Sequence, residues 1–492
     1  MLFNSYVFVF LMLPISVAGY YLFNKISEKA GIFFLLLCSF LYIGYMNPAY
    51  LYVLIPSILV NYLLFQIMNT KCKGNIIARK LVLATGIIFD VGLLAYFKYA
   101  DFFIETMNEL LSKEYSTLKL LVPLGISFYT FQQISFLVDT YRDESIKCSF
   151  DEYALYITFY PQFVQGPIVL QDEFIPQLRD KTKKNINIEN ISKGMYRFIL
   201  GLAKKVLIAD SIAIVVDAGY NGIEDIAALS SLVLIIGYTL QIYFDFSAYS
   251  DMAVGLGRMF NIDLPENFDS PYKANNIDEF WERWHITLTR FLTRYLYFPL
   301  GGSKKGKFRT YINIMLVFLI SGLWHGAEWS FVIWGGVHGL AKVISRIRRD
   351  LYKTQTKRTW IGRIITFLYV SIAWVFFRAQ TMLDAVHLLS SLFKGGWRGL
   401  SVSMYESFSK LVEVSWLLRL DVLGIRNHVQ GLVVIVIFIV LTVVCFTMAN
   451  TREIVERWSN KTGLKHALLI GTLFAWCILS FNGVTNFIYW SF

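Results

Sequence analysis

The sequence predicts an all-α polytopic membrane protein, and two features carry this prediction. Hydrophobic residues make up 56% of the 492-residue chain and charged residues only 16%, whereas soluble domains carry about 25% charged residues. Uncharged runs such as 51–70 and 431–450 reach the roughly 20 residues that cross a bilayer as a helix. We therefore expect one membrane domain, residues 1–492, with about eleven to thirteen spanning or re-entrant helices.

The first hundred residues predict four spanning helices. Their apolar runs cover residues 6–23, 31–44, 51–69 and 81–97. The first run has neither a basic segment before it nor a small-residue cleavage site, so we interpret it as a transmembrane helix rather than a signal peptide. Residues 101–114 follow with four acids and one lysine, and they are expected to form a loop.

The placement of basic residues predicts the orientation of the chain. Basic segments such as 71–80, 177–184 and 342–363 alternate with neutral or acidic ones, which places these segments in the cytoplasm and both termini outside. Because the net charge of +11 is spread over such short segments, it does not indicate nucleic-acid binding. Lys204 and Lys205 are expected to anchor the cytoplasmic interface.

The sequence gives little indication of a metal site or of disulfide bonds. The five cysteines are scattered without a CxxC pair, and no HxxxH or HExxH spacing occurs. We therefore expect free thiols and no metal site. A nucleophilic serine triad is also disfavoured, because no GxSxG motif occurs.

Residues 245–302 interrupt the series of apolar runs. This stretch is too polar for simple membrane spans, yet it is dense in aromatic residues. Disordered segments contain few aromatic residues, and long loops in compact proteins are usually functional or disordered. We expect a folded, membrane-embedded and functional segment.

Two of the six histidines are candidates for catalysis. His325 lies in an apolar run beside Ser321, Gly322, Gly326 and Ala327, small residues that allow a substrate or another helix to approach closely. An imidazole suits general-base catalysis near neutral pH. A buried histidine bonded to a backbone carbonyl remains an alternative. His338 lies thirteen residues further on, about 140° away on a continuous helix, so it is expected to be a structural partner.

His285 is the second candidate. Acidic and basic residues, among them Arg283 and Arg290, recur around it at helical spacing between aromatic residues. An amphipathic interfacial helix explains part of this pattern. The basic groups could also hold the phosphates of a cofactor such as coenzyme A. His387, His428 and His466 are expected to be interfacial.

Seven strings carry a family resemblance. They are VPLGISFYTFQQISFLVDTYR (122–142), FYPQFVQGPI (159–168), YFDFSAYSDMAVGLGRMF (243–260), LPENFDSPY (264–272), FWERWHITLTRFLTRYLYFPLGG (280–302), SGLWHGAEWSFVIWGGVHG (321–339) and WVFFRAQTMLDA (374–385). Together they resemble the membrane-bound O-acyltransferase family, in particular its bacterial alginate O-acetyltransferase branch. The resemblance divides the domain into N-terminal helices (1–115), a catalytic core (116–385) and C-terminal helices (386–492).

The resemblance implies a fold and a mechanism. Helices would surround a central funnel or tunnel in a bacterial cytoplasmic membrane, with the acyl donor arriving from the cytoplasm and the acceptor from outside. His325 in LWHG would act as general base on an acceptor hydroxyl that attacks an acyl thioester. His285 in RWHITL would position the donor or polarise its carbonyl. Residues expected to bind substrate are Trp324, Arg283, Arg290, Asp245, Tyr249, Ser250 and Asp251, with helix capping or packing as the alternative for the last four.

The resemblance also implies partners and substrates. The donor is expected to be acetyl-CoA as a co-substrate, with no bound cofactor. The acceptor would be an exported or cell-surface polysaccharide, reached through an extracytoplasmic SGNH-hydrolase-like partner. One alternative is D-alanyl transfer to teichoic acid. Another is a transporter or channel in which His325 relays protons.

Overall fold

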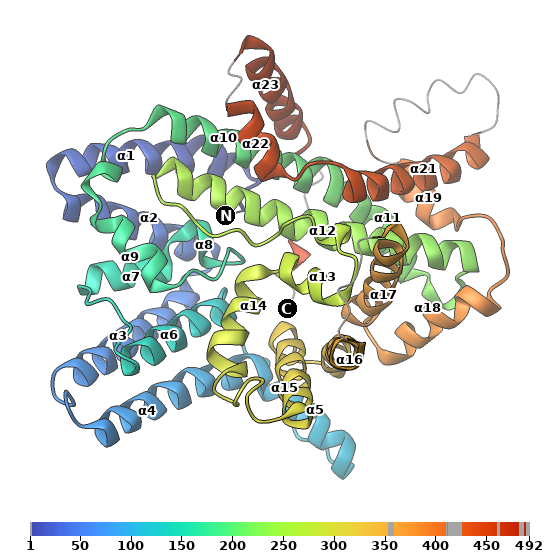
Figure 1. Cartoon of the computed structure of the whole chain (residues 1–492). Coiled ribbons are helices and arrows are strands. Elements are labelled where there is room, and N and C mark those ends of the chain that lie inside the picture. The colour runs from blue at the N-terminus through green and yellow to red at the C-terminus, as the bar shows by residue number, and fades with distance from the viewer. Residues whose placement is uncertain are drawn as a thin grey trace.

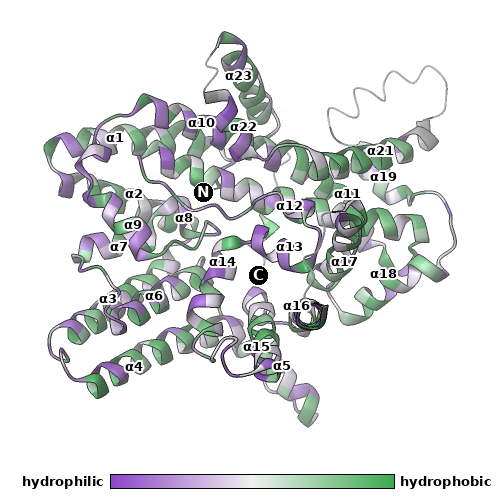
Figure 2. Ribbon diagram, in the orientation of Figure 1, coloured by the Kyte–Doolittle hydropathy of each residue, from purple (hydrophilic) through white to green (hydrophobic). Residues whose placement is uncertain are grey.

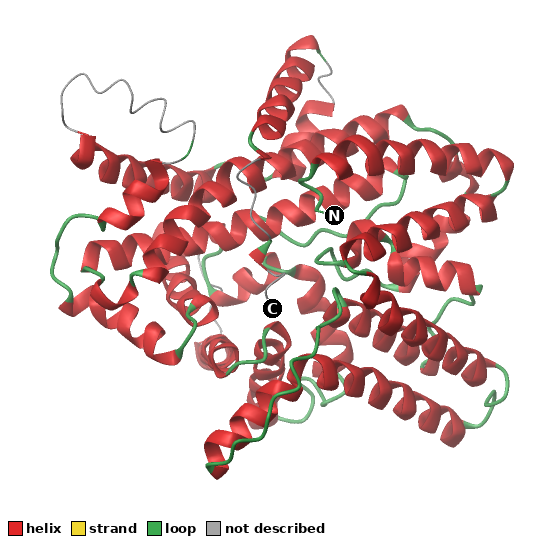
Figure 3. Ribbon diagram, turned by 180° about the vertical axis from the view of Figure 1, so that it is seen from behind, coloured by secondary structure: helices red, strands yellow, loops and turns green. Residues whose placement is uncertain are grey.

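The computed structural model describes residues 2–352, 359–409, 411, 426–459, 463–481 and 487–488. Every regular element in these ranges is helical, and the pairing of Phe268 with Trp284 is an isolated β-bridge. Seen from behind, helices make up all sides of the molecule (Figure 3). The predicted all-α fold is confirmed.

The first part of the chain contains the four predicted spans. It forms η1 (Phe8–Met12), α1 (Leu13–Ile26), α2 (Glu28–Met46), η2 (Pro48–Tyr50), α3 (Leu51–Asn69), α4 (Ile76–Leu94), η3 (Ala95–Tyr99) and α5 (Ala100–Leu111). Ser27 and Asn75 start α2 and α4 by accepting hydrogen bonds from the backbone N–H groups of Ala30 and Ala78, as N-cap residues do. The prediction of four helices is confirmed.

The predicted loop at 101–114 is wrong, because most of it forms α5. Exposed Phe103, Met107 and Leu110 recur at helical spacing between the acids, which makes this segment an amphipathic helix. The chain then returns along α5. The backbone N–H groups of Leu118 and Lys119 donate to the carboxylate of Asp101 at 2.6 and 3.0 Å.

The middle of the chain is organised around α12, which has 32 residues. Its elements are α6 (Ile126–Tyr141), α7 (Phe150–Thr158), α8 (Tyr160–Phe163), α9 (Gln171–Arg179), η4 (Lys181–Lys184), α10 (Ile188–Ala203), η5 (Lys204–Ala209), α11 (Asp210–Asn221), η6 (Ile223–Asp225) and α12 (Ala228–Met259). α12 crosses the middle of the molecule (Figure 1) and packs against α10, α11 and α17. α10 and α12 approach closely because both carry glycine: a Cβ atom at Gly194 would lie 2.6 Å from the carbonyl oxygen of Gly255.

The expectation that residues 245–302 are folded is confirmed, whereas the expectation that they are too polar for a membrane span is wrong for 245–259. Residues 245–259 complete α12, whose apolar window is largely buried inside the protein. The α12 carboxylates of Asp245 and Asp251 are paired with Lys205 at 2.6 Å and Lys204 at 2.8 Å. This pairing makes the polar sequence compatible with a buried helix. The two lysines face α12, and their expected place at the cytoplasmic interface stays a prediction.

The remaining helices surround the candidate site. They are η7 (Pro271–Lys273), α13 (Ile277–Arg283), α14 (Ile286–Leu292), η8 (Thr293–Tyr297), α15 (Lys307–His325), α16 (Trp329–Tyr352), α17 (Trp360–Arg378), α18 (Met382–Lys394), α19 (Val402–Ser409), α21 (Arg426–Thr447), α22 (Thr451–Ser459) and α23 (Leu464–Leu479). Part of the predicted basic segment 342–363 lies outside the described residues.

Seven helical segments of the described chain are long and apolar enough to cross a membrane. Other expected segments correspond to shorter or more polar helices such as α6, α15 and α23, so the count of eleven to thirteen stays a prediction. Hydrophobic residues dominate α3, α4 and α21, whereas α13, α14 and α22 carry more hydrophilic ones (Figure 2). The polar helices α13 and α14 lie in the middle of the molecule (Figure 1).

Candidate active site

His325 is the last residue of α15 and is 3% exposed. The helix ends there because Gly326 takes an extended conformation, and α16 begins at Trp329. The small residues before His325 serve a helix contact. A Cβ atom at Gly322 would lie 2.2 Å from the carbonyl oxygen of Phe331 on α16. The predicted close approach is therefore made by another helix.

Lys98 and Tyr99 hold the end of α15. The Lys98 ammonium donates to the carbonyl oxygens of Trp324 at 2.7 Å and His325 at 3.2 Å, and the Tyr99 hydroxyl donates to Leu323 at 2.8 Å. The last carbonyls of a helix lack intrahelical partners, and a cation there is stabilised by the helix dipole. Three successive carbonyls that end on His325 are thus fixed from η3, a π-helical turn.

Sequence reasoning missed Lys98, although a signal was present. The lysine directly follows the predicted apolar run 81–97, and ionisable residues at membrane depth usually have a function. The π-helical turn that aims Lys98 and Tyr99 at α15 has no such signal.

His285 lies in a break between α13 and α14, where the sequence spacing favours a continuous helix. Its φ of 44° is left-handed, a conformation that costs a residue with a Cβ atom about 1–2 kcal/mol. The break is held by residues 267–269, which run beside it. Ile286 N–H donates to the Asn267 carbonyl, and Asp269 N–H to the Arg283 carbonyl, both at 3.0 Å.

The His285 ring is fully buried and has one hydrogen-bond partner among the described residues. Its Nδ1 lies 3.0 Å from Oδ1 of Asn267. Burial lowers the pKa of His285 to about 3, because the charged imidazolium is poorly solvated there. The ring is therefore neutral at physiological pH.

The two candidate histidines lie together. Their ring centroids are 6.4 Å apart, and the Trp324 ring contacts both, at 6.1 Å from His285 and 4.9 Å from His325. Trp334 and Phe377 pack on His325 at 5.1 and 5.4 Å. The site is thus a pair of imidazoles in an aromatic enclosure, where the low dielectric strengthens polar interactions.

The argument that separated His338 from His325 is wrong, because it assumed one continuous helix. The chain turns between α15 and α16, and both histidines contact the Trp334 ring. His338 is fully buried and also packs on Trp281 at 5.1 Å. Its role as a structural partner stays a prediction.

The other predicted substrate-binding residues are engaged within the protein. Arg283 pairs with Glu279 at 3.0 Å, and Arg290 pairs with Glu173. Asp245 and Asp251 form the ion pairs described above. Tyr249 stacks on Phe3 at 5.0 Å, and Ser250 lines a small cavity beside Asp251. The structure brings Trp324 to the two histidines and engages these other residues in contacts with other parts of the protein.

A cavity of about 270 Å³ lies near the histidine pair, although neither histidine lines it. Ser321, one helical turn before His325, and Leu288, one turn after His285, line it. α15 and α16 run antiparallel, since Tyr311 near the start of α15 bonds Asp350 near the end of α16. The cavity's basic residues, Lys342, Arg346 and Arg349, therefore lie on the part of α16 far from His325.

A larger cleft of about 1460 Å³ lies between α13, α16 and α17. Asp278 and Arg349 line both this cleft and the smaller cavity, so the two adjoin. Burial opposes ionisation of Asp278, yet its ion pair with Lys342 and the hydrogen bond from Ser345 lower its pKa. Basic and acidic groups thus alternate where cleft and cavity meet.

Comparison with known proteins identifies the family of the chain. The profile of the membrane-bound O-acyltransferase family matches residues 137–384. A peptidoglycan O-acetyltransferase of Helicobacter pylori is 39% identical over 424 residues, covering 80% of each chain. The probable alginate O-acetylase AlgI of Pseudomonas putida is 36% identical over 81% of each chain, and a teichoic acid D-alanyltransferase of Bacillus subtilis is 26% identical over 52% of this chain. The chain therefore belongs to the membrane-bound O-acyltransferase family and is an O-acyltransferase.

Proposed function

We propose that this protein transfers acetyl groups from a cytoplasmic thioester to a polysaccharide of the bacterial cell envelope. The observation that carries the proposal is the buried pair of His325 and His285, with the 270 Å³ cavity beginning one helical turn from each. The relatives named for peptidoglycan and alginate acetylation cover 80% and 81% of this chain. The D-alanyltransferase covers only 52%, which favours acetyl over D-alanyl transfer.

The reaction needs one base and one leaving group. His325 accepts the proton of an acceptor hydroxyl, whose oxygen attacks the thioester carbonyl. The carbon–sulfur bond breaks, the acetyl ester forms, and the thiolate takes the proton from His325. Atoms and charges balance without a metal or a redox partner. His285 lies across from His325 to orient the reacting groups.

The cavity suits a thioester donor. Its 270 Å³ fits a slender arm rather than a nucleotide, and the adjoining cleft offers the volume for the nucleotide of acetyl-CoA. Lys342, Arg346 and Arg349 would attract the donor's phosphates. These residues belong to a basic segment that the positive-inside rule places in the cytoplasm. An extracytoplasmic SGNH-hydrolase-like partner would complete delivery to the glycan.

The test is acetyl transfer from radiolabelled acetyl-CoA in membranes that contain the unmodified protein, His325→Ala or His285→Ala. The partner and the glycan are supplied from the same operon, and size-exclusion profiles of the solubilised variants check folding. We expect label in the glycan only when both histidines are present. Equal labelling with His325→Ala would show that the imidazole is structural, and labelling from a D-alanyl carrier protein alone would favour the teichoic acid reaction.

A further inference from the structure

The side-chain amide of Asn267 has a defined orientation. Its Oδ1 lies 3.3 Å from the backbone nitrogen of Thr287 and 3.0 Å from the Thr287 hydroxyl. A backbone N–H can only donate, so the Asn267 atom that faces it must be the oxygen. The Thr287 hydroxyl already accepts from Ile168 N–H at 2.9 Å, so its proton is available for the same oxygen.

This oxygen determines which nitrogen of His285 carries hydrogen. Nδ1 of His285 lies 3.0 Å from Asn267 Oδ1, and a carbonyl oxygen cannot donate, so Nδ1 is the N–H. A neutral imidazole has one N–H. Nε2 therefore presents a lone pair.

The lone pair of Nε2 is buried and has no hydrogen-bond partner among the described residues. The rings around His285 are Phe246 of α12 at 4.8 Å and Trp324 of α15 at 6.1 Å. The His325 ring, whose centroid is 6.4 Å away, is a titratable ring neighbour of His285, and Lys98 holds the backbone of His325. Because buried acceptors are usually hydrogen-bonded, we expect a ligand to supply the donor for Nε2.

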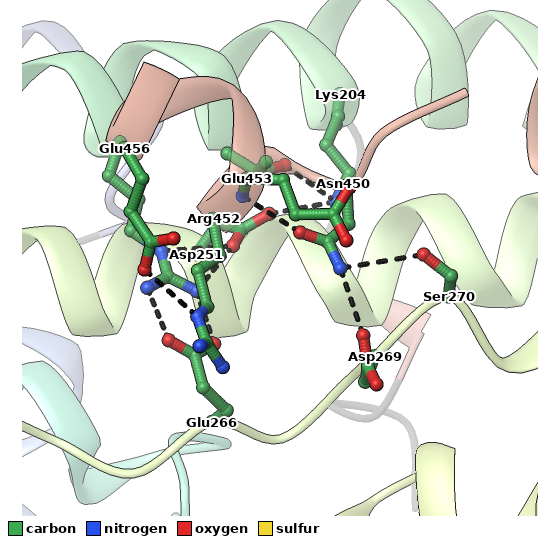
Figure 4. Close-up of polar contacts among 11 residues, drawn as sticks. Lys204, Asp251, Glu266, Asp269, Ser270, Asn450, Arg452, Glu453 and Glu456 are labelled. Carbon is green, nitrogen blue, oxygen red and sulfur yellow. Dashed lines mark hydrogen bonds and ion pairs between the residues drawn. The ribbon is translucent and has the colours of Figure 1, made fainter. Parts of the chain in front are cut away.

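Ion pairs anchor the loop that carries Asn267. Glu266, the preceding residue, accepts a hydrogen bond at 2.6 Å from Arg197 of α10, which also bonds Asp251 of α12 at 3.0 Å. On the other side, Asn450 donates to Asp269 at 3.0 Å. Figure 4 shows Glu266 and Asp251 in this cluster and Asn450 reaching toward Asp269 and Ser270. The cluster fixes the loop on both sides of Asn267.

We propose that Asn267 is a positioning residue which locks His285 as the Nδ1–H tautomer, and that His285 thereby binds the hydroxyl acceptor rather than the thioester donor. The inference rests on the proposed function and deepens it. A bare Nε2 cannot donate a hydrogen bond to the donor's carbonyl oxygen, but it can accept one from a hydroxyl of the acceptor other than the one that His325 deprotonates. This replaces the expectation that His285 polarises the carbonyl.

Three variants test the inference in the full-length protein with its partner. Asn267→Leu removes the oxygen that accepts from Nδ1 of His285. His285→Asn keeps an N–H for Asn267 but removes Nε2. Asn267→Asp keeps the accepting oxygen and adds a charge. Asn190→Leu is the matched control, since the side-chain amide of Asn190 bonds Asn261 rather than a histidine. Initial rates are measured against acetyl-CoA and against solubilised peptidoglycan fragments and alginate oligomers.

We expect Asn267→Leu and His285→Asn to raise KM for the accepted glycan about tenfold or more, with KM for acetyl-CoA within about twofold of that of the unmodified protein. Asn267→Asp should remain active, and the acid limb of its pH–rate profile should move to higher pH, because a carboxylate beside Nδ1–H favours the imidazolium. Asn190→Leu should match the unmodified protein.

Any other result contradicts either the inference or the proposed function. A rise in KM for acetyl-CoA alone, or unchanged kinetics in Asn267→Leu, overturns the inference while the proposed function stands. If Asn267→Leu does not fold, the pH profile of Asn267→Asp decides, and an unshifted acid limb overturns the inference. If the unmodified protein acetylates neither glycan, the proposed function fails and the inference fails with it.

Discussion

His325 and His285 meet in one small volume but are supported differently. His325 ends a long helix, and Lys98 and Tyr99 hold the backbone beneath it. His285 lies in a break between two helices of seven residues each, and the amide of Asn267 holds its ring directly. The position of His325 thus depends on the packing of whole helices, whereas the tautomer of His285 depends on one side chain.

This difference separates the kinds of change to which each histidine is sensitive. Near His325, backbone carbonyls are held by residues of η3, which lies more than two hundred residues earlier in the chain. Near His285, a loop is fixed through a buried cluster of charges. Substitutions that remove the contacts of Lys98 or Tyr99 should therefore mainly lower turnover. Substitutions in the charge cluster that fixes the loop should mainly lower stability.

The largest effect is expected for His325→Ala. Losing a general base lowers turnover by about 10²–10⁴-fold, and acetyl transfer in membranes measures it. His338→Phe provides the matched control, because His338 is equally buried and contacts the same Trp334 ring. It should keep turnover within about threefold if its role is packing. A loss in His338→Phe as large as in His325→Ala would instead place His338 in the reaction.

Arg197→Met should act on folding. It leaves the carboxylates of Glu266 and Asp251 without the guanidinium that now pairs with both, and breaking a buried ion pair costs about 3–5 kcal/mol. We expect a clearly lower Tm of the solubilised protein. Lys193→Met, which removes an i,i+4 surface pair with Glu189, should change the stability by less than about 0.5 kcal/mol. Equal Tm values for the two variants would contradict the importance of the buried cluster.

The sequence predicted the first four helices well, because α1 to α4 expose much of their apolar surface and hydropathy reports that surface directly. It failed at α12, where Asp245 and Asp251 make the sequence polar although their lysine partners neutralise them inside the protein. Hydropathy treats each residue alone, and the stability of a buried charge depends on its partner.

The same limit of sequence-based prediction applies to the candidate active site. The two histidines could be chosen from the sequence because their neighbours are unusual and their motifs resemble a known family. Their mutual distance could not be predicted, because it depends on a helix break at His285 and a helix end at His325. Asn267 lies within the LPENFDSPY motif, but nothing in the sequence indicates its contact with His285. The contacts of Lys98 form only when η3 and α15 are packed together.

Lys98→Met tests whether the terminal amino group of Lys98 supports His325. The variant keeps an apolar chain of similar length but removes the ammonium from the end of α15. We expect turnover to fall about tenfold, equivalent to about 1.4 kcal/mol, a size consistent with a partly buried cation at a helix C-terminus. Acetyl-CoA affinity should change little, and Lys98→Arg should recover part of the rate. A lowered Tm without a change in turnover per folded molecule would assign Lys98 to stability alone.

Tyr99→Phe should have the smallest effect on this side of the site. It removes one hydrogen bond of 2.8 Å to the Leu323 carbonyl while the ring stays in place, and such a bond contributes about 0.5–1.5 kcal/mol. Because Lys98 still holds the next two carbonyls, we expect turnover to fall about two- to fivefold. The double variant with Lys98→Met should then lose more than the product of the single losses, since the end of α15 would have neither support. Strictly multiplicative losses would show that the two residues act independently and that His325 does not depend on a jointly held helix end.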